Sequence, residues 1–253
     1  MRARFHFTAA TVAVVVLVGC AAPSPQTVQG DCAEFQGANV CSWTTLDGAD
    51  SLTEFGLSVP LAAIEQAPLD LPMVWPPVLG AVVRMPAQVT AAMGVDHVTI
   101  YWEPHGHPPG PYLTPHFDFH FYHVSSDARE AIDCVDLTKP SVLPAGYGLV
   151  DVEIPEVGIL EGLCVPSMGM HALLASELES EEVFDGTMVI GYNRGNPIFF
   201  EPMITREMFM RRQSFELPMP EVSSLPEGVR YPTHYRAEYD AETDAYRFIF
   251  SGG

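Results

Sequence analysis

Apolar and polar positions alternate along much of the chain, and this pattern predicts short β-strands. Turn sequences such as Asn193-Arg194-Gly195-Asn196 and residues 240–244 separate strand-like runs, and each predicts a hairpin. Asp47-Gly48 predicts a further hairpin within residues 43–60. The other runs typical of strands are residues 98–102, 115–124, 147–154, 187–192, 197–200, 231–239 and 246–250.

Helical segments are predicted to be few and short. The 23 prolines and 20 glycines favour turns over a helical bundle. The predicted helices are residues 61–66, residues 127–133 with Ser126 as N-cap, residues 171–179, and a helix from Thr205 to about residue 212. The predicted fold class is therefore mainly β: an antiparallel β-barrel or sandwich with a few short helices. Residues 46–253 are predicted to form a single β-rich domain.

The N-terminus has the pattern of an export signal. Arg2 and Arg4 precede an apolar run over residues 8–19, which is shorter than the roughly 20 residues of a membrane-spanning helix. The run ends in Leu-Val-Gly-Cys, which resembles a bacterial lipobox and makes Cys20 the predicted lipidation site. The prediction is a lipoprotein signal peptide at 1–19, then a lipidated tether and small disulfide loop at 20–45.

The cysteines also indicate a protein that is exported from the cytoplasm. Apart from Cys20, four cysteines remain, and in an oxidising compartment they are expected to pair. Nearest-neighbour pairing predicts disulfides Cys32–Cys41 and Cys134–Cys164, the second worth about 3.5 kcal/mol in the chain-entropy model. A thiolate metal site is the alternative, and the sequence contains no Cys-x-x-Cys to favour it.

Charge narrows the range of partners. The chain has 12 basic and 32 acidic residues, a formal net charge of -20. Such a surface repels phosphate backbones, so nucleic-acid binding is not expected. The expected contact with a membrane is through the lipid anchor. Removal of residues 1–19 takes away Arg2 and Arg4 and no acidic residue, which makes the exported chain more acidic still.

The segment with the clearest chemistry is His-Phe-Asp-Phe-His-Phe at residues 116–121. In a strand its three phenylalanines share one face, which is expected to point into a core, while His116, Asp118 and His120 share the other. Residues two apart lie about 6.6 Å apart, a spacing that suits chelation of one ion, whereas residues four apart lie about 13 Å apart. His116 and His120 could therefore share one ion only across a bulge or a strong twist. Alternatively, Asp118 binds the ion together with one histidine, or it orients that histidine. A metal-free polar network is the remaining interpretation of the row.

Other residues could complete a metal site. His171 and Glu201 are predicted as ligands, and His107 and His105, in the proline-rich loop before the histidine strand, as additional ones. A mixed histidine and carboxylate set suits zinc, manganese or iron, and Met168 and Met170 would add soft ligands for copper. These methionines are interpreted as core residues, however. His97 and His234 lack such neighbours and are predicted to lie at the surface.

Three motifs carry a resemblance to a known family. They are WEPHGHPPGPYLTPHFDFHFY (102–122), GMH (169–171) and FFEPMIT (199–205). Together they resemble a family of secreted bacterial proteins of unknown function typified by a hypothetical protein of Thermus, over roughly residues 52–210. The resemblance implies that His107, His116, Asp118, His120, His171 and Glu201 occupy motif positions. Ala172 departs from the pattern, in which an aromatic residue follows the histidine, and it bears on the shape of the pocket near His171.

The predicted function is a lipid-anchored extracytoplasmic protein that binds one divalent metal ion through His116, Asp118, His120, His171 and Glu201. The alternative is a non-catalytic module at the cell surface that binds a small molecule or a protein in a polar histidine pocket. A metal-free hydrolase is disfavoured because the sequence has no Gly-x-Ser-x-Gly elbow.

Overall fold

The computed structural model describes residues 24–180 and 182–253. The predicted signal peptide at 1–19, the lipidation site Cys20 and the first residues of the predicted tether lie outside these ranges. Among the described residues, no helix is long and apolar enough to cross a membrane.

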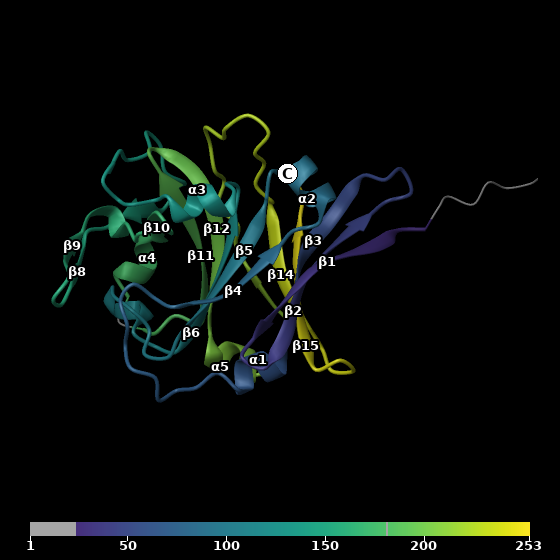
Figure 1. Ribbon diagram of the computed structural model, residues 1–253, viewed down its shortest axis with the longest axis horizontal. Helices are drawn as coiled ribbons and strands as arrows, with labels where there is room; N and C mark the ends of the chain where they lie inside the picture. Colours follow the sequence, from purple (N-terminus) through teal and green to yellow (C-terminus); the bar gives the residue numbers. More distant parts are fainter. Residues whose placement is uncertain (1–23, 181) are drawn as a thin grey trace, which may run out of the picture.

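Two antiparallel sheets stack face to face, so the fold is mainly β and a sandwich, the second of the two predicted architectures (Figure 1). The first sheet has six strands in the order β1-β2-β3-β15-β14-β13. Its strands are β1 (Gln26–Phe35), β2 (Ala38–Leu46), β3 (Leu52–Pro60), β13 (Phe215–Leu217), β14 (His234–Asp240) and β15 (Ala245–Ser251). The predicted hairpins at 43–60 and 231–250 both lie in this sheet.

The second sheet has seven strands in the order β4-β5-β6-β12-β11-β10-β7. Its strands are β4 (Leu79–Arg84), β5 (His97–Glu103), β6 (His116–Tyr122), β7 (Tyr147–Leu149), β10 (Met170–Leu174), β11 (Gly186–Asn193) and β12 (Asn196–Thr205). The predicted hairpin across Asn193–Asn196 is the β11–β12 turn. The predicted strand 147–154 is instead divided between β7 and β8 (Val152–Ile154), and β8 pairs only with β9 (Gly158–Leu160).

Strands begin upstream of the predicted start of the domain. β1 and β2 occupy most of the segment predicted as a tether and small disulfide loop, and both belong to the first sheet. Cys32 lies directly opposite Cys41 in this strand pair, and the two form the predicted disulfide. The β-rich part of the described chain therefore begins at Gln26 rather than at residue 46.

Seven short helices connect the strands of the described chain. They are α1 (Leu61–Glu65), α2 (Ala87–Met93), η1 (Gly110–Tyr112), α3 (Ser126–Glu130), η2 (Glu161–Leu163), α4 (Ala175–Leu178) and α5 (Arg206–Met210). The Thr205 hydroxyl accepts a hydrogen bond from the Met208 N–H and caps α5 as predicted. α3 is capped by Ser125 instead of Ser126. The predicted helix at 171–179 is wrong in its first half, because His171 lies on β10.

The core between the two sheets is lined by the phenylalanine face of β6. Phe117, Phe119 and Phe121 are completely buried there, which confirms the predicted direction of that face. The Phe119 ring centroid lies 4.9 Å from that of Phe248, and the Phe121 centroid lies 4.7 Å from that of Phe250. Both contacts join β6 to β15 across the sandwich, so the inner face of the second sheet is held by aromatic packing.

The outer face of the second sheet is buried as well, except along the edge strand β4, where Val82 and Arg84 are exposed. Two segments lie over this face: the loop 104–115, and the loops and short elements of residues 126–168 other than β7. We call these two segments together the cover. In Figure 1 the cover lies on the opposite side of the second sheet from the first sheet. Its residues Ile132, Val152 and Leu163 pack with Tyr122 and Phe199 of the sheet in a separate apolar cluster. The predicted disulfide Cys134–Cys164 links two parts of the cover.

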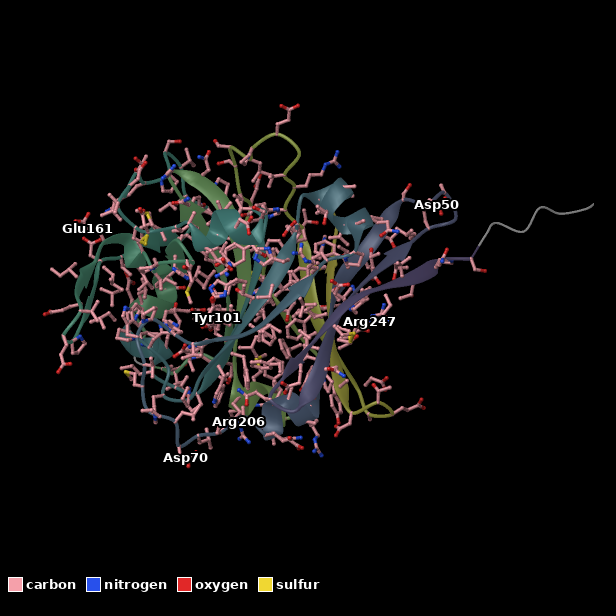
Figure 2. The ribbon with its side chains drawn as sticks, viewed as in Figure 1. Asp50, Asp70, Tyr101, Glu161, Arg206 and Arg247 are labelled. Carbon is pink, nitrogen blue, oxygen red and sulfur yellow. A yellow bond between two sulfur atoms is a disulfide. The ribbon has the colours of Figure 1, made fainter. Side chains whose placement is uncertain are left out.

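Side chains on this outer face are interior residues despite their polarity. Tyr101 of β5 is buried and lies near the middle of the view in Figure 2, whereas Asp50, Asp70 and Glu161 lie at the periphery. His97, at the start of the same strand, is completely buried and stacks on Tyr122. The prediction that His97 lies at the surface is therefore wrong, because the cover buries this face.

Candidate metal centre

The polar face of β6 lies on the outer side of the second sheet, beneath the cover. The phenylalanine face lies on the other side, in the core between the two sheets. His116, Asp118 and His120 are 0%, 4% and 1% exposed. β6 pairs with β5 from His97↔Tyr122 to Glu103↔His116 without a register shift. The strand is regular at this point, so the predicted alternation is confirmed and no bulge brings His116 and His120 together.

Other elements supply further ligands to the same face. Glu201 comes from β12, the neighbour of β6, and His171 comes from β10. Gly191 lies opposite His171 in the β10–β11 pair, and a Cβ there would collide with the Phe199 ring. Glycine at this position therefore lets Phe199 pack beneath His171 and His120, at centroid distances of 5.2 and 4.8 Å.

His107 reaches the outer face from the loop 104–115. Gly106 has a φ of 66°, and a Cβ there would collide with the carbonyl oxygen of Tyr112. Glycine is therefore required for the tight return that aims His107 at the strand. The Tyr112 carbonyl also accepts a hydrogen bond of 3.2 Å from the His107 N–H, which fixes the backbone of the loop.

The most deeply buried group is His120–His171–Glu201. The two Nε2 atoms of the histidines lie 3.5 Å apart, and His120 Nε2 lies 3.4 Å from a Glu201 carboxylate oxygen. One ligand atom of each residue lies within 4.8 Å of those of the other two, a spacing at which they could hold a metal ion. We call this group the inner triad.

A second group, His107–His116–Asp118, lies beside the first. His116 Nε2 is 3.3 Å from one Asp118 oxygen, and His107 Nε2 is 4.0 Å from the other. These ligand atoms also lie within 4.8 Å of one another. We call this group the outer triad, because the His107 side chain is 17% exposed whereas all three residues of the inner triad are buried.

The structure thus divides the predicted ligand set into two. His116 and Asp118 meet in one triad, while His120, His171 and Glu201 meet in the other. Of the two additional candidates, His107 joins the outer triad, but His105 turns away. The His105 side chain is hydrogen-bonded to the Leu71 carbonyl at 2.7 Å, on an exposed part of the loop.

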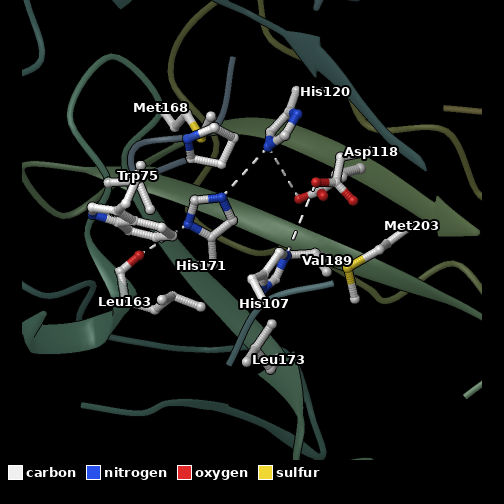
Figure 3. A pocket seen from close by; sticks show the side chains of 13 residues that line it. Trp75, His107, Asp118, His120, Leu163, Met168, His171, Leu173, Val189 and Met203 are labelled. Atoms are coloured by element: carbon white, nitrogen blue, oxygen red, sulfur yellow. Dashed lines mark hydrogen bonds and ion pairs between the residues drawn. The ribbon is translucent and has the colours of Figure 1, made fainter. Parts of the chain in front are cut away.

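One cavity joins the two triads (Figure 3). His107, Asp118, His120, His171 and Glu201 all line it, together with an apolar wall that includes Trp75, Leu163 and Met168. The free space within it is about 20 Å³, which is room for a water-sized group beside the ligand atoms rather than for a large substrate. Met168 is a buried core residue, as predicted, and it also lines the cavity.

Hydrogen bonds assign the proton positions of three histidines. His107, His116 and His171 place Nδ1 at 2.9, 2.7 and 3.0 Å from the carbonyl oxygens of Pro108, Thr114 and Leu163. A carbonyl only accepts, so we assign Nδ1 as the protonated nitrogen in each ring. Each Nε2 then carries a lone pair directed at its triad, the arrangement found in metal-binding histidines.

Burial sets the protonation states in the metal-free protein. It lowers the pKa of His171 to about 4 and that of His116 and His120 well below the usual range, so these rings are neutral at pH 7. Burial also raises the pKa of Asp118 and Glu201 well above the usual range, and the charge of Asp118 adds to the rise at Glu201. Neutral imidazoles and tightly spaced carboxyls are a metal-binding set that has no cationic side chain within it.

The sequence analysis missed one acidic neighbour of the site. Glu103 lies directly opposite His116 in the β5–β6 pair and is 8% exposed. Burial raises the pKa of Glu103 to about 8, and its charge also raises the pKa of Asp118. The sequence could have indicated Glu103 as a residue of the site. It extends the alternation of the predicted strand at 98–102 by one position and shares a face with Tyr101.

Comparison with protein-family models, curated proteins and solved structures gives no match. The resemblance to a family of secreted bacterial proteins therefore stays a prediction. What the fold and the site define is a disulfide-bonded β-sandwich with two buried histidine and carboxylate triads that could hold metal.

Proposed function

We propose that this protein is a lipid-anchored extracytoplasmic protein that binds a divalent metal ion at the inner triad. The observation that carries the proposal is the convergence of His120, His171 and Glu201, from three different strands, within 4.8 Å. Glu201 Oε2 is buried without a hydrogen-bond partner, 3.4 Å from His120 Nε2. Because a buried polar atom left unpaired costs about 1–3 kcal/mol, its retention at this site favours a role as a metal ligand.

The triad leaves room for chemistry at the ion. Two histidines and one carboxylate are the protein ligands of many catalytic zinc and iron sites, in which a further position binds water or substrate. The cavity of about 20 Å³ offers that position to a molecule as small as water. The nitrogen and oxygen donors suit zinc, manganese or iron, and Met168 in the cavity wall would add a soft ligand for copper.

Two observations support the proposed location. All four cysteines of the described chain are paired in disulfides, which form and persist in oxidising compartments. The N-terminal charge pattern, apolar run and lipobox-like sequence support export and acylation at Cys20. Mass spectrometry of the N-terminal peptide tests the anchor: we expect a diacylated Cys20, and an unmodified peptide that retains residues 1–19 would contradict it.

Metal content tests the binding proposal. The full chain, purified in detergent without a polyhistidine tag and supplied with zinc, is expected to retain at least one ion per chain and to lose thermal stability on addition of a chelator. His171→Gln should abolish binding at the inner triad, and His105→Gln, in an exposed loop, is the matched control that should not affect it.

Fewer than about 0.2 ion per chain, together with chelator-independent melting, would overturn the proposal. The alternative, a metal-free polar pocket for a small molecule or a protein, predicts that result. It also predicts that His120→Gln changes the free energy of unfolding without any zinc-dependent component.

A further inference from the structure

The outer triad brings together the hydrogen-bond acceptor atoms of three side chains. In His107 and His116 the Nδ1 proton is donated to a backbone carbonyl, which leaves each Nε2 as a lone pair. These two nitrogens face the two oxygens of the Asp118 carboxylate at 4.0 and 3.3 Å. Acceptors repel one another at this distance unless a cation or a proton lies between them. A proton on Asp118 can pair with only one of the two imidazole nitrogens, whereas a divalent cation can bind both nitrogens and the carboxylate.

The unpaired atoms of this group are deeply buried. His116 Nε2 and Asp118 Oδ1 have no hydrogen-bond partner, and their side chains are 0% and 6% exposed. His116 is also pinned from two sides, by its bond to Thr114 and by edge contact with the ring of Phe184 at a centroid distance of 5.4 Å. The ring therefore cannot readily turn to pair Nε2 elsewhere, so the geometry of the triad is preorganised.

The outer triad lies next to the inner one. Asp118 and His120 are two residues apart on the same face of β6, which places their Cα atoms about 6.6 Å apart. Both line the cavity that also contains Glu201 and His171. Each triad has its own pair of imidazoles and its own carboxylate, and the carboxylates of Asp118 and Glu201 are close enough to interact.

From this arrangement we propose that His107, His116 and Asp118 form a second divalent-metal site, so that the protein holds a two-ion centre. This inference rests on the proposed function of the inner triad and goes beyond it. Two divalent ions would exceed the charge of the Asp118 and Glu201 carboxylates and make the cavity cationic, although the chain as a whole carries a formal net charge of -20. Such centres bind an anionic oxygen ligand between or beside the two ions.

Zinc stoichiometry with paired variants tests the second site. The full chain without a polyhistidine tag is stripped with chelator, dialysed against excess zinc, and its metal content measured by elemental analysis. We expect two ions in the wild type, one in His107→Gln/His116→Gln, one in His171→Gln/Glu201→Gln, and none in the quadruple variant. His105→Gln, in the same loop as His107, should retain two.

The other results separate the two proposals. One ion in the wild type, retained in His107→Gln/His116→Gln but lost in His171→Gln/Glu201→Gln, overturns the second site and leaves the inner one standing. A wild type that binds a single ion, and loses it in each of the two double variants, also overturns the second site. That result would favour one ion shared by both triads. No ion in any protein overturns both.

A measurement on the wild type alone guards against variants that fail to fold. Cobalt(II) titration of the stripped protein is followed by its visible absorbance, and manganese(II) loading by electron paramagnetic resonance. We expect the cobalt signal to saturate at two equivalents and the manganese spectrum to show coupling between neighbouring ions. Saturation at one equivalent with an uncoupled manganese spectrum would overturn the second site.

Discussion

The two faces of β6 are made by one alternating sequence and are buried to the same extent, yet they differ in what covers them. The inner face packs against a second sheet, and its phenylalanines meet Phe248 and Phe250 ring to ring. The outer face lies under loops and short elements, and its side chains include atoms with no partner, such as His116 Nε2. Burial alone therefore does not distinguish a structural face from a functional one.

The difference is energetic. Removing apolar area from water stabilises the fold by about 25 cal/mol per Å², so the inner face favours folding. Burying a polar atom without a partner costs about 1–3 kcal/mol, so the outer face opposes folding in the metal-free protein. A metal ion at the triads would offset that cost, because it pairs ligand atoms such as His116 Nε2 and Glu201 Oε2 that burial leaves without partners.

The largest effect is expected from damage to the inner face. Phe119→Ala should lower the free energy of unfolding by about 3–5 kcal/mol, because it opens a cavity between the two sheets. Val135→Ala, at a valine that is 80% exposed, is the control and should cost less than about 0.5 kcal/mol. Chemical denaturation in the presence of chelator measures both. A loss below about 1 kcal/mol for Phe119→Ala would contradict the packing described here.

The two disulfides offer a comparison between the cover and the first sheet. Cys134→Ser/Cys164→Ser opens a loop of 30 residues and should cost about 3.5 kcal/mol, while Cys32→Ser/Cys41→Ser opens one of 9 and should cost about 2.5 kcal/mol. The first pair should also weaken zinc binding, because Cys164 adjoins Leu163, whose carbonyl orients His171. Equal zinc affinity in the two variants would show that the cover does not organise the site.

Loss of an outer-face ligand should have a smaller effect that depends on metal. With zinc at 100 times its dissociation constant, the wild type should gain about 2.7 kcal/mol of stability, and Glu201→Gln should lose most of that gain. In chelator the variant should be as stable as the wild type or more so at pH 8, because the amide cannot carry the charge that burial disfavours. Paired denaturation curves with zinc and with chelator provide the measurement. A large loss in chelator would assign Glu201 a structural role.

The smallest effect on stability is expected from His123, a histidine that lies outside both triads. His123 follows β6 and packs on Tyr231 at a centroid distance of 4.6 Å, and burial lowers its pKa to about 4. Between the unfolded value near 6.5 and this folded value, the unfolded chain binds more protons, so the contribution of His123 to stability declines as the pH falls. The stability of the wild type relative to His123→Gln should therefore be constant above pH 6.5 and decrease toward pH 4. A difference independent of pH in chelator would contradict the burial of this ring.

Half of the site could be predicted from the alternation, because three of its six ligands lie on one strand. The alternation in residues 116–121 determines which side chains share a face, and a regular strand keeps His116 and His120 about 13 Å apart, which is why they belong to different triads. The disulfide pairs were also correct, because both join cysteines that are neighbours in sequence. The secondary-structure prediction was wrong where strand pairing in the sheet outweighed the local preference for helix. Residues 171–174 form a strand because Ala172 pairs with Ile190 on one side and Leu149 on the other.

The sequence by itself determined a mainly β fold, its disulfides, and the row of histidines and aspartate opposite a row of phenylalanines. Only the tertiary structure decided that both rows are buried and that His107, from a loop held by Gly106, joins His116 and Asp118. It also decided that His171 and Glu201 meet His120 while His105 does not. The physical reason is that local periodicity fixes the direction of a side chain, whereas the partners it meets depend on contacts between strands and loops far apart in the chain.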